Sequence, residues 1–266
     1  MAQPTSSTLT FPAPSATLLS PYLPSTSSHN RPFLTLTYAT SLDATLSLTP
    51  TTPTLLSGPL SKSMTHYLRA HHAAILIGAG TAIADDPSLN SRLEGAEIDR
   101  QPRPVVLDPR GRWAVGGGSK VVSLARQGRG LGPWVMVMEG VDVDGEKVRV
   151  VEGVGGAYVT LSTNEDGRFD WKDVLDVLWK EGVTSVMVEG GGVVINELLS
   201  PRYFGLVDAV IVTIAPVWLG REGVQVCPEE RRDGEGKKVA VGRLRDVRWV
   251  PLGEDGVLCG RPKMDE

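Results

Sequence analysis

Two glycine-rich segments, each directly after a short apolar run, could bind a phosphorylated ligand. The run 73–77 leads into the turn 78–81, and the run 184–188 leads into the glycines at 190–192. The second segment opens a predicted helix, whose free N–H groups and partial positive charge attract phosphate. Glycine lets a ligand approach the backbone closely. If the two strands are neighbours, we expect the segments to hold the two ends of a pyrophosphate-bridged cofactor.

Other nucleotide-binding signatures fit the sequence poorly. Neither segment reads GxGxxG with an acidic residue at the expected distance, which argues against a Rossmann domain. Neither is followed by the Gly-Lys-Ser/Thr of a Walker A motif, which argues against a nucleotide triphosphatase. Taken alone, glycines after a strand are more often only a tight turn. The interpretation therefore depends on the two segments lying together.

Charged residues near these segments suggest further contacts. Arg110 and Arg112 follow a predicted strand that ends at residue 108. An arginine there could hold a 2′-phosphate and favour NADP over NAD, and a solvent-exposed arginine is the equal alternative.

The adjacent carboxylates Asp85 and Asp86 should point apart, and no third ligand is evident, so we expect no metal. One should bond a ribose or an amide, and the other should cap a turn.

The composition excludes several function classes. The chain has 266 residues, of which 41% are hydrophobic, and a formal net charge of −4. Without a basic surplus, nucleic-acid binding has little electrostatic support. No apolar run reaches the roughly 20 residues of a membrane span. The two cysteines, Cys227 and Cys259, are far apart, which fits a reducing, cytoplasmic compartment.

The pattern of apolar residues predicts an α/β fold with one main sheet. Helices are expected from residue 60 to about 71, with Ser57 or Ser61 as the N-cap, at 171–180 with Asp170 as the N-cap, and at 193–199. Residues 114–133, 139–149 and 221–242 are expected to be irregular or surface segments. Strands are expected at 33–39, 73–77, 104–108, 134–138, 157–161, 184–188, 208–215, 243–250 and 256–260.

The first 31 residues differ from the rest. They are rich in Ser, Thr and Pro, and residues 1–30 carry no Asp, Glu, Lys or Arg. They match neither a secretory signal nor a transit peptide, so we expect a loosely ordered extension. A single functional domain is expected over 32–262.

An ordered set of motifs resembles the riboflavin-biosynthesis reductase family, in particular its stand-alone fungal members. The resemblance extends from about residue 32 to 261. It implies a dihydrofolate-reductase-like three-layer fold with a mainly parallel central sheet flanked by helices, NADPH as the cofactor, and a homodimer. The matching motifs are Ser41-Leu42-Asp43, Leu68-Arg69, the turn 78–81, the run 85–92 (DDPSLNSR), the run 188–191 (VEGG), Val207-Asp208, Ile214-Ala215-Pro216 and Leu219-Gly220.

The resemblance also assigns residues to the expected site. For the substrate it implies Ser41, Asn90 and Arg92, and Asp43 is the candidate for orienting the substrate or relaying a proton. A carboxylate that only fixes a turn is an equal alternative for Asp43. Arg69 and Arg92 are candidates for a substrate phosphate, with a surface role as the alternative for Arg69. For the cofactor it implies Gly80, Thr81, Asp85, Gly190, Gly191, Gly192 and Val193, to which the residue pattern adds Arg110.

The reaction implied by the resemblance is hydride transfer from NADPH to C1′ of a phosphorylated ribosylaminopyrimidine, which gives the ribitylamino product. The partner is therefore a small phosphorylated pyrimidine, with no nucleic acid or membrane. Two alternatives remain open: a pterin or dihydrofolate-type reductase on the same fold, and a non-catalytic nucleotide-binding protein. A pterin pocket would need an acidic group at the ring edge, whereas a 5′-phosphate needs basic groups near Asn90 and Arg92.

Overall fold

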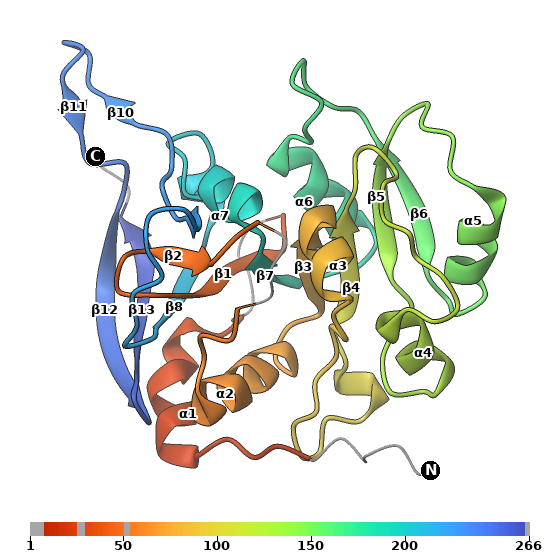
Figure 1. Cartoon of the computed structure of the whole chain (residues 1–266), viewed down its shortest axis with the longest axis horizontal. Coiled ribbons are helices and arrows are strands. Elements are labelled where there is room, and N and C mark those ends of the chain that lie inside the picture. The colour runs from red at the N-terminus through yellow and green to blue at the C-terminus, as the bar shows by residue number, and fades with distance from the viewer. Residues whose placement is uncertain (1–7, 26–29, 51–53, 264–266) are drawn as a thin grey trace.

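A nine-stranded sheet forms the centre of the computed structural model, which describes residues 8–25, 30–50 and 54–263 (Figure 1). The strand order is β12-β13-β8-β1-β7-β3-β4-β5-β6. All pairings from β8 to β6 are parallel, and only β13 and β12 run antiparallel to their neighbours. The strands are β1 (Phe33–Thr40), β3 (Ala74–Gly78), β4 (Arg103–Leu107), β5 (Trp134–Met138), β6 (Ala157–Leu161), β7 (Ser185–Gly190), β8 (Ala209–Ile214), β12 (Arg243–Leu252) and β13 (Asp255–Lys263).

Helices cover both faces of the sheet, so the predicted three-layer α/β architecture is confirmed. One face packs against α6 (Trp171–Lys180) and α7 (Gly192–Leu198). The other face packs against α1 (Ala13–Leu19), α2 (Pro59–Arg69), α3 (Ala79–Asp85), α4 (Lys120–Arg126) and α5 (Gly145–Glu152). The smaller elements are η1 (Ser20–Tyr22), η2 (Ile98–Arg100), η3 (Phe204–Leu206), β2 (Thr45–Ser47), β9 (Val224–Gln225), β10 (Arg231–Arg232) and β11 (Lys238–Val239).

The predicted elements with a clear apolar pattern are present. Helix α6 buries Trp171, Val174, Leu175 and Leu178 on one side, and the Asp170 carboxylate accepts a hydrogen bond from the Lys172 N–H at 2.9 Å. This is the expected N-cap, which satisfies one of the free N–H groups of the first turn. Strand β8 contains almost no polar residue and is buried along nearly its whole length, as a central strand covered on both faces should be.

Several local predictions were wrong. Helix α2 begins at Pro59 with Gly58 as its N-cap, so neither Ser57 nor Ser61 caps it. Proline at the first helical position needs no N–H partner, which explains why the helix starts there. The segment 114–133, expected to be irregular, contains the short helix α4. The segments 139–149 and 221–242 lie at the surface as expected, although they contain most of α5 and the short strands β9, β10 and β11.

The turn predicted at 78–81 is also different. Strand β3 ends at Gly78, and α3 starts directly at Ala79, so Gly80 and Thr81 lie in the first turn of a helix. The backbone N–H groups at this helix start have no intrahelical partner. Both glycine segments therefore place a helix N-terminus at the carboxyl end of a parallel strand.

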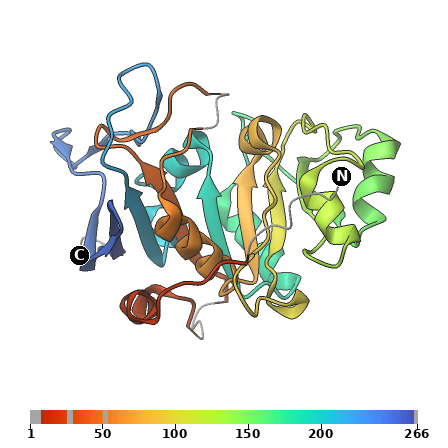
Figure 2. The same ribbon diagram turned by 60° about the horizontal axis from the view of Figure 1, so that its bottom comes forward.

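The N-terminal extension is not loosely ordered over residues 8–25. Leu19 and Tyr22 are 0% and 2% exposed and pack with Met64 and Leu68 of α2, on the face shown in Figure 2. The Leu9 N–H donates to the Arg92 carbonyl at 2.9 Å, and the Glu94 N–H donates to the Leu9 carbonyl at 2.8 Å. The composition concealed this order because a few buried apolar side chains suffice to fix a short segment. Residues 1–7 and 26–29 lie outside the described residues.

Candidate active site

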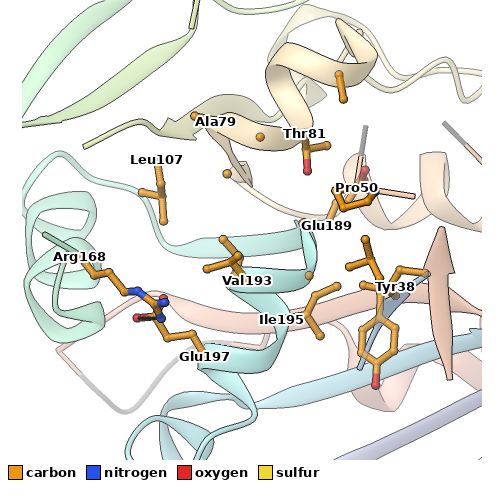
Figure 3. A pocket seen from close by; sticks show the side chains of 18 of the residues that line it. Tyr38, Pro50, Ala79, Thr81, Leu107, Arg168, Glu189, Val193, Ile195 and Glu197 are labelled. Atoms are coloured by element: carbon orange, nitrogen blue, oxygen red, sulfur yellow. Dashed lines mark ion pairs between the residues drawn. The ribbon is translucent and has the colours of Figure 1, made fainter. Parts of the chain in front are cut away.

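A cavity of about 830 Å³ opens at the carboxyl ends of the parallel strands (Figure 3). Its volume lies in the range of small-molecule and cofactor sites, and ligands of α/β sheets bind at this edge. Its walls come from β1, α3, the loops after β4 and β6, and α7. In Figure 3, Thr81 and Glu189 lie toward one end of the cavity, and Arg168 and Glu197 lie toward the other.

The two glycine segments meet across neighbouring strands, as predicted, because β3 pairs with β7. A Cβ atom on Gly191 would lie 2.9 Å from Thr81 Oγ1, and Gly191 has a φ of +85°, which L side chains rarely adopt. Gly80, Thr81, Gly191, Gly192 and Val193 all line the cavity. This wall is thus largely backbone.

Gly190 differs from the other predicted cofactor residues. It is buried and does not line the cavity. Its φ of +112° turns the chain from β7 into α7, and a Cβ there would lie 3.0 Å from Ile195 Cδ1. The structure therefore gives Gly190 a role in packing α7 against the sheet.

The adjacent carboxylates Asp85 and Asp86 lie in different surroundings. Asp85 lines the cavity, and burial raises the pKa of its carboxyl, which nearby Lys120 partly offsets. Asp86 accepts hydrogen bonds from the Lys120 N–H at 3.1 and 3.3 Å, at the first residue of α4. Asp86 thus caps a helix instead of the expected turn, and a contact of Asp85 with a ribose or an amide stays a prediction. In the described part of the chain no group of three or more His, Cys, Asp or Glu residues could hold a metal ion.

Three arginines line the same cavity on loops after β4 and β6. Arg110 and Arg112 line the cavity and are exposed, which fits both of the alternatives left open by the sequence. Arg168 was missed, because the loop 162–170 carries no motif. Its Nη1 lies 3.9 Å from Glu197 Oε1, and the Trp171 Nε1–H donates to Glu197 Oε2 at 3.2 Å. Burial raises the pKa of the Glu197 carboxyl.

A second, smaller pocket of about 260 Å³ lies next to the first. Its lining is basic and hydroxyl-rich: Leu55, Ser57, Lys62, Thr65, His66, Arg69, Ser88 and Arg92. Arg69 and Arg92 were predicted from the sequence, and Lys62 and His66 were not. Lys62, Thr65, His66 and Arg69 all belong to α2, where spacings of three and four residues place them on one face.

A mostly buried ion pair connects the two pockets. Arg69 Nε and Nη2 donate to the two carboxylate oxygens of Glu189 at 2.6 and 2.5 Å, and Arg69 Nη1 donates to the Asn90 carbonyl at 3.0 Å. The side chains of Arg69 and Glu189 are only 12% and 15% exposed. Glu189 lines the large cavity while Arg69 lines the small one. The alternative of a surface role for Arg69 is therefore wrong.

Asn90 does not reach either pocket. Its side chain is buried, and its amide donates to the Arg129 carbonyl at 3.0 Å. Among the described residues, Asn90 Oδ1 has no hydrogen-bond partner. Asn90 therefore joins the loop before Arg92 to the loop at residue 129, and a direct contact with substrate stays a prediction that this geometry does not support.

Ser41 and Asp43 lie at the end of β1 and line neither pocket. Asp43 accepts hydrogen bonds from Ser41 Oγ at 2.5 Å and from the N–H groups of Leu219 and Gly220 at 3.1 and 2.7 Å. These donors, Ser41 foremost, lower the pKa of Asp43 to about 2. The carboxylate is thus ionised and fixes the loop 216–220, which disfavours a role as proton donor.

No helix in the described ranges is long and apolar enough to cross a membrane. The model of the RibD C-terminal domain matches residues 32–258. The 2,5-diamino-6-ribosylamino-4(3H)-pyrimidinone 5′-phosphate reductase of Debaryomyces hansenii is 41% identical, over 91% of this chain and 94% of the relative. The protein of the same name from Eremothecium gossypii is 42% identical, over 92% and 95%.

Solved structures agree with the sequence relatives. The riboflavin biosynthesis reductase of Saccharomyces cerevisiae superposes with a TM-score of 0.74 at 34% identity and covers 93% of this chain and 98% of its own. RibD of Acinetobacter baumannii shares the fold with a TM-score of 0.68, and this chain spans 60% of that protein. Reductases of this kind use a nicotinamide cofactor. The chain therefore belongs to the family of 2,5-diamino-6-ribosylamino-4(3H)-pyrimidinone 5′-phosphate reductases of riboflavin biosynthesis.

Proposed function

We propose that this chain reduces the ribosylamino side chain of 2,5-diamino-6-(5-phosphoribosylamino)pyrimidin-4(3H)-one to a ribitylamino group, with NADPH as the reductant. The observation that carries the proposal is the pair of adjoining pockets, one walled by glycine backbone and one lined by basic side chains. They share the Arg69–Glu189 ion pair. A dinucleotide in the first and a sugar phosphate in the second would bring the cofactor and C1′ together at this boundary.

The large cavity fits a dinucleotide. Gly191 has a positive φ, and a side chain at this position would fill the space between its backbone and Thr81. Without a side chain, that space is open to a ligand. Gly192 and Val193 supply free N–H groups at the start of α7, which suit a pyrophosphate. Thr81 and Asp85 face it from α3. When bound there, NADPH supplies the hydride.

The arginines at the other end of the cavity support NADPH over NADH. Arg110 and Arg112 are cations on the loop after β4, and Arg168 is a cation on the loop after β6, so a 2′-phosphate would bring a dianion among them. The half-buried carboxylate of Glu197 lies beside Arg168 and would keep its guanidinium in place. These residues bind and orient, and none needs to exchange a proton.

The small pocket supports the phosphorylated substrate. Lys62, Arg69 and Arg92 place three cations around a space of about 260 Å³. Glu189 fixes the Arg69 guanidinium through two hydrogen bonds and also borders the cofactor cavity, so it would position substrate and cofactor relative to each other. Among the described residues, the lining of the small pocket includes no carboxylate for a pterin ring, and the nearby Glu189 is paired with Arg69.

The direct test follows the absorbance of NADPH with the purified chain. Oxidation with the ribosylaminopyrimidine 5′-phosphate, and none with dihydrofolate, is the expected result. Oxidation with dihydrofolate alone would favour the pterin alternative. Binding of NADPH without turnover of either compound would favour a non-catalytic nucleotide-binding protein.

We also propose that the protein is a cytoplasmic homodimer. The dimer is supported by β12, an edge strand of the sheet whose Val247 and Trp249 are 44% and 61% exposed. Light scattering after size exclusion should give twice the chain mass, and Trp249→Lys should lower it. A wild-type mass of one chain would contradict the dimer.

A further inference from the structure

His66 of α2 contacts Arg92 at two points. The ring is only 4% exposed, and it lines the small basic pocket. Its Nδ1 accepts a hydrogen bond from the Arg92 backbone N–H at 3.1 Å, and its Nε2 lies 3.1 Å from Arg92 Nη2. The His66 carbonyl accepts from Ser91 Oγ at 2.7 Å. The ring thus holds the loop that carries Arg92 against α2.

These contacts cannot both be hydrogen bonds. A neutral imidazole has one donor and one acceptor nitrogen, and a guanidinium has only donors. Because Nδ1 accepts from the Arg92 backbone, Nε2 carries the hydrogen and faces an Arg92 N–H. The other nitrogen assignment moves the conflict to Nδ1 without removing it. The N–H of the buried ring and an N–H of the partly buried guanidinium are therefore directed at each other, which is unfavourable unless a shared acceptor lies beside them.

Protonation does not resolve the conflict. A second ring proton would leave both nitrogens as donors and add a cation near Arg69, Arg92 and Lys62. Burial, followed by these three cations, lowers the pKa of His66 to about 3, against a small opposing contribution from the Asn90 backbone. The ring is therefore neutral at physiological pH, with one N–H to donate.

The surroundings favour an anion as the missing acceptor. The lining of this pocket brings together Lys62, Arg69 and Arg92 with the hydroxyls of Ser57, Thr65 and Ser88, and among the described residues it includes no carboxylate. Glu189 neutralises Arg69 from the side of the large cavity. The remaining charge suits one phosphate group, whose oxygens accept several hydrogen bonds at once.

We propose that His66 is an anion-binding residue whose Nε2–H and the Arg92 guanidinium donate together to one phosphate oxygen. The pocket then recognises the phosphate of a sugar phosphate rather than the sugar. That this phosphate belongs to the substrate rests on the proposed function, whereas binding of phosphate itself does not. The neutral His66 ring would thus increase the selectivity of the pocket for phosphate by adding a hydrogen-bond donor, without adding another positive charge.

Two variants of His66 separate anion binding from loop anchoring. The Oδ1 of Asn lies as many bonds from Cβ as Nδ1 does, so His66→Asn keeps an acceptor for the Arg92 N–H and loses the Nε2 donor. The terminal amide of Gln reaches the position of Nε2, so His66→Gln keeps the donor and loses the anchor. Thermal unfolding of both variants, with and without NADPH, checks that they fold.

The measurement is calorimetric titration of each protein with inorganic phosphate, ribose 5-phosphate and ribose. The wild type should bind both phosphates and not ribose. His66→Asn should bind both at least tenfold more weakly, the usual effect of losing a hydrogen bond to a charged group, while His66→Gln stays within about threefold. Both variants should bind NADPH as the wild type does.

Each outcome decides the proposal. Equal phosphate affinity in His66→Asn and wild type, or no phosphate binding by the wild type, would overturn the role of His66. Weakened binding only in His66→Gln would show that the ring merely anchors the loop and would also overturn it. If His66→Asn loses phosphate but the wild type fails to oxidise NADPH with the pyrimidine substrate, the anion site stands and the proposed function fails.

Discussion

The two adjoining pockets differ in what lines them, backbone in one and side chains in the other. The large cavity has a wall of glycine backbone and helix starts, where a Cβ on Gly191 would lie only 2.9 Å from Thr81 Oγ1. The small pocket is made of long polar side chains from α2 and the loop before Arg92. The large cavity should therefore lose ligand binding when side-chain atoms are added to its wall. The small pocket should lose ligand binding when charges or hydrogen-bond donors are removed. That difference allows the two binding functions to be separated by mutation.

Gly191→Val should have the largest effect. A β-branched residue is strained at a φ of +85°, and its Cβ would lie 2.9 Å from Thr81 Oγ1. NADPH affinity, measured by fluorescence titration, should fall by more than about 100-fold because the backbone can no longer be approached. Gly118→Ala is the matched control, since a Cβ there meets nothing within 4 Å. Unchanged affinity in Gly191→Val would remove this segment from the cofactor site.

Arg69→Gln should damage the small pocket and spare the large one. It leaves Glu189 as an unpaired, mostly buried carboxylate, which should cost about 3 kcal/mol of unfolding free energy in urea titrations. The KM for the phosphorylated substrate should rise, roughly 10- to 100-fold, with NADPH affinity unchanged. Arg149→Gln, at an exposed position on α5, is the control. A loss of NADPH affinity as large as the KM effect would contradict the separation of the pockets.

A second histidine, His72, contrasts with His66 because both of its ring nitrogens have hydrogen-bond partners. It is buried, with Thr35 Oγ1 at 2.8 Å from Nε2 and the Leu68 carbonyl at 2.7 Å from Nδ1. Burial lowers the pKa of His72 to about 4, whereas its unfolded value is 6.5. Between these values the unfolded chain binds more protons, so stability is full above pH 6.5 and is lost as the pH falls toward 4.

The size of this effect is on the order of 3 kcal/mol, because each pKa unit corresponds to about 1.4 kcal/mol. His66 contributes in the same direction, so the difference between variants is the informative quantity. His72→Gln should lower stability at pH 7.5 and reduce its change between pH 7.5 and 4.5, as followed by urea unfolding. The same pH slope in the variant and the wild type would show that His72 is not the titrating group.

Arg168→Gln should have the smallest effect. The residue is exposed and lies beside Glu197 at 3.9 Å, so solvent screens its charge. NADPH affinity should fall about three- to tenfold, while NADH affinity stays the same, because only the former has a 2′-phosphate. An equal loss for both cofactors would point to a general packing effect of the loop.

How far the sequence predicts the site depends on whether its parts follow from the pairing of strands. Thr81 and Gly191 could be paired in advance because both follow strands, and the ends of neighbouring parallel strands meet. His66 and Lys62 could not, since the small pocket exists only where α2 packs against the loop at 88–92. Ser41 and Asp43 show the reverse case, because a polar group at a strand end can serve a neighbouring loop instead of a ligand.

The fold shows the same limit. Long apolar patterns predicted α6 and β8, whereas α4 and α5 were missed because each is short and lies among glycines. The N-terminal segment was misjudged because its order depends on two buried side chains, Leu19 and Tyr22, and on pairing with the distant residues 92–94. Contacts of that kind leave no periodic signal in the chain.

The most direct test of the two-pocket account compares the phosphorylated pyrimidine with its dephosphorylated form in the NADPH oxidation assay. With the 5′-phosphate, the wild type should oxidise NADPH at a rate that saturates with substrate. Without it, kcat/KM should fall by at least 100-fold, while NADPH affinity stays unchanged. Equal kcat/KM for the two compounds would contradict the assignment of the basic pocket to the substrate phosphate.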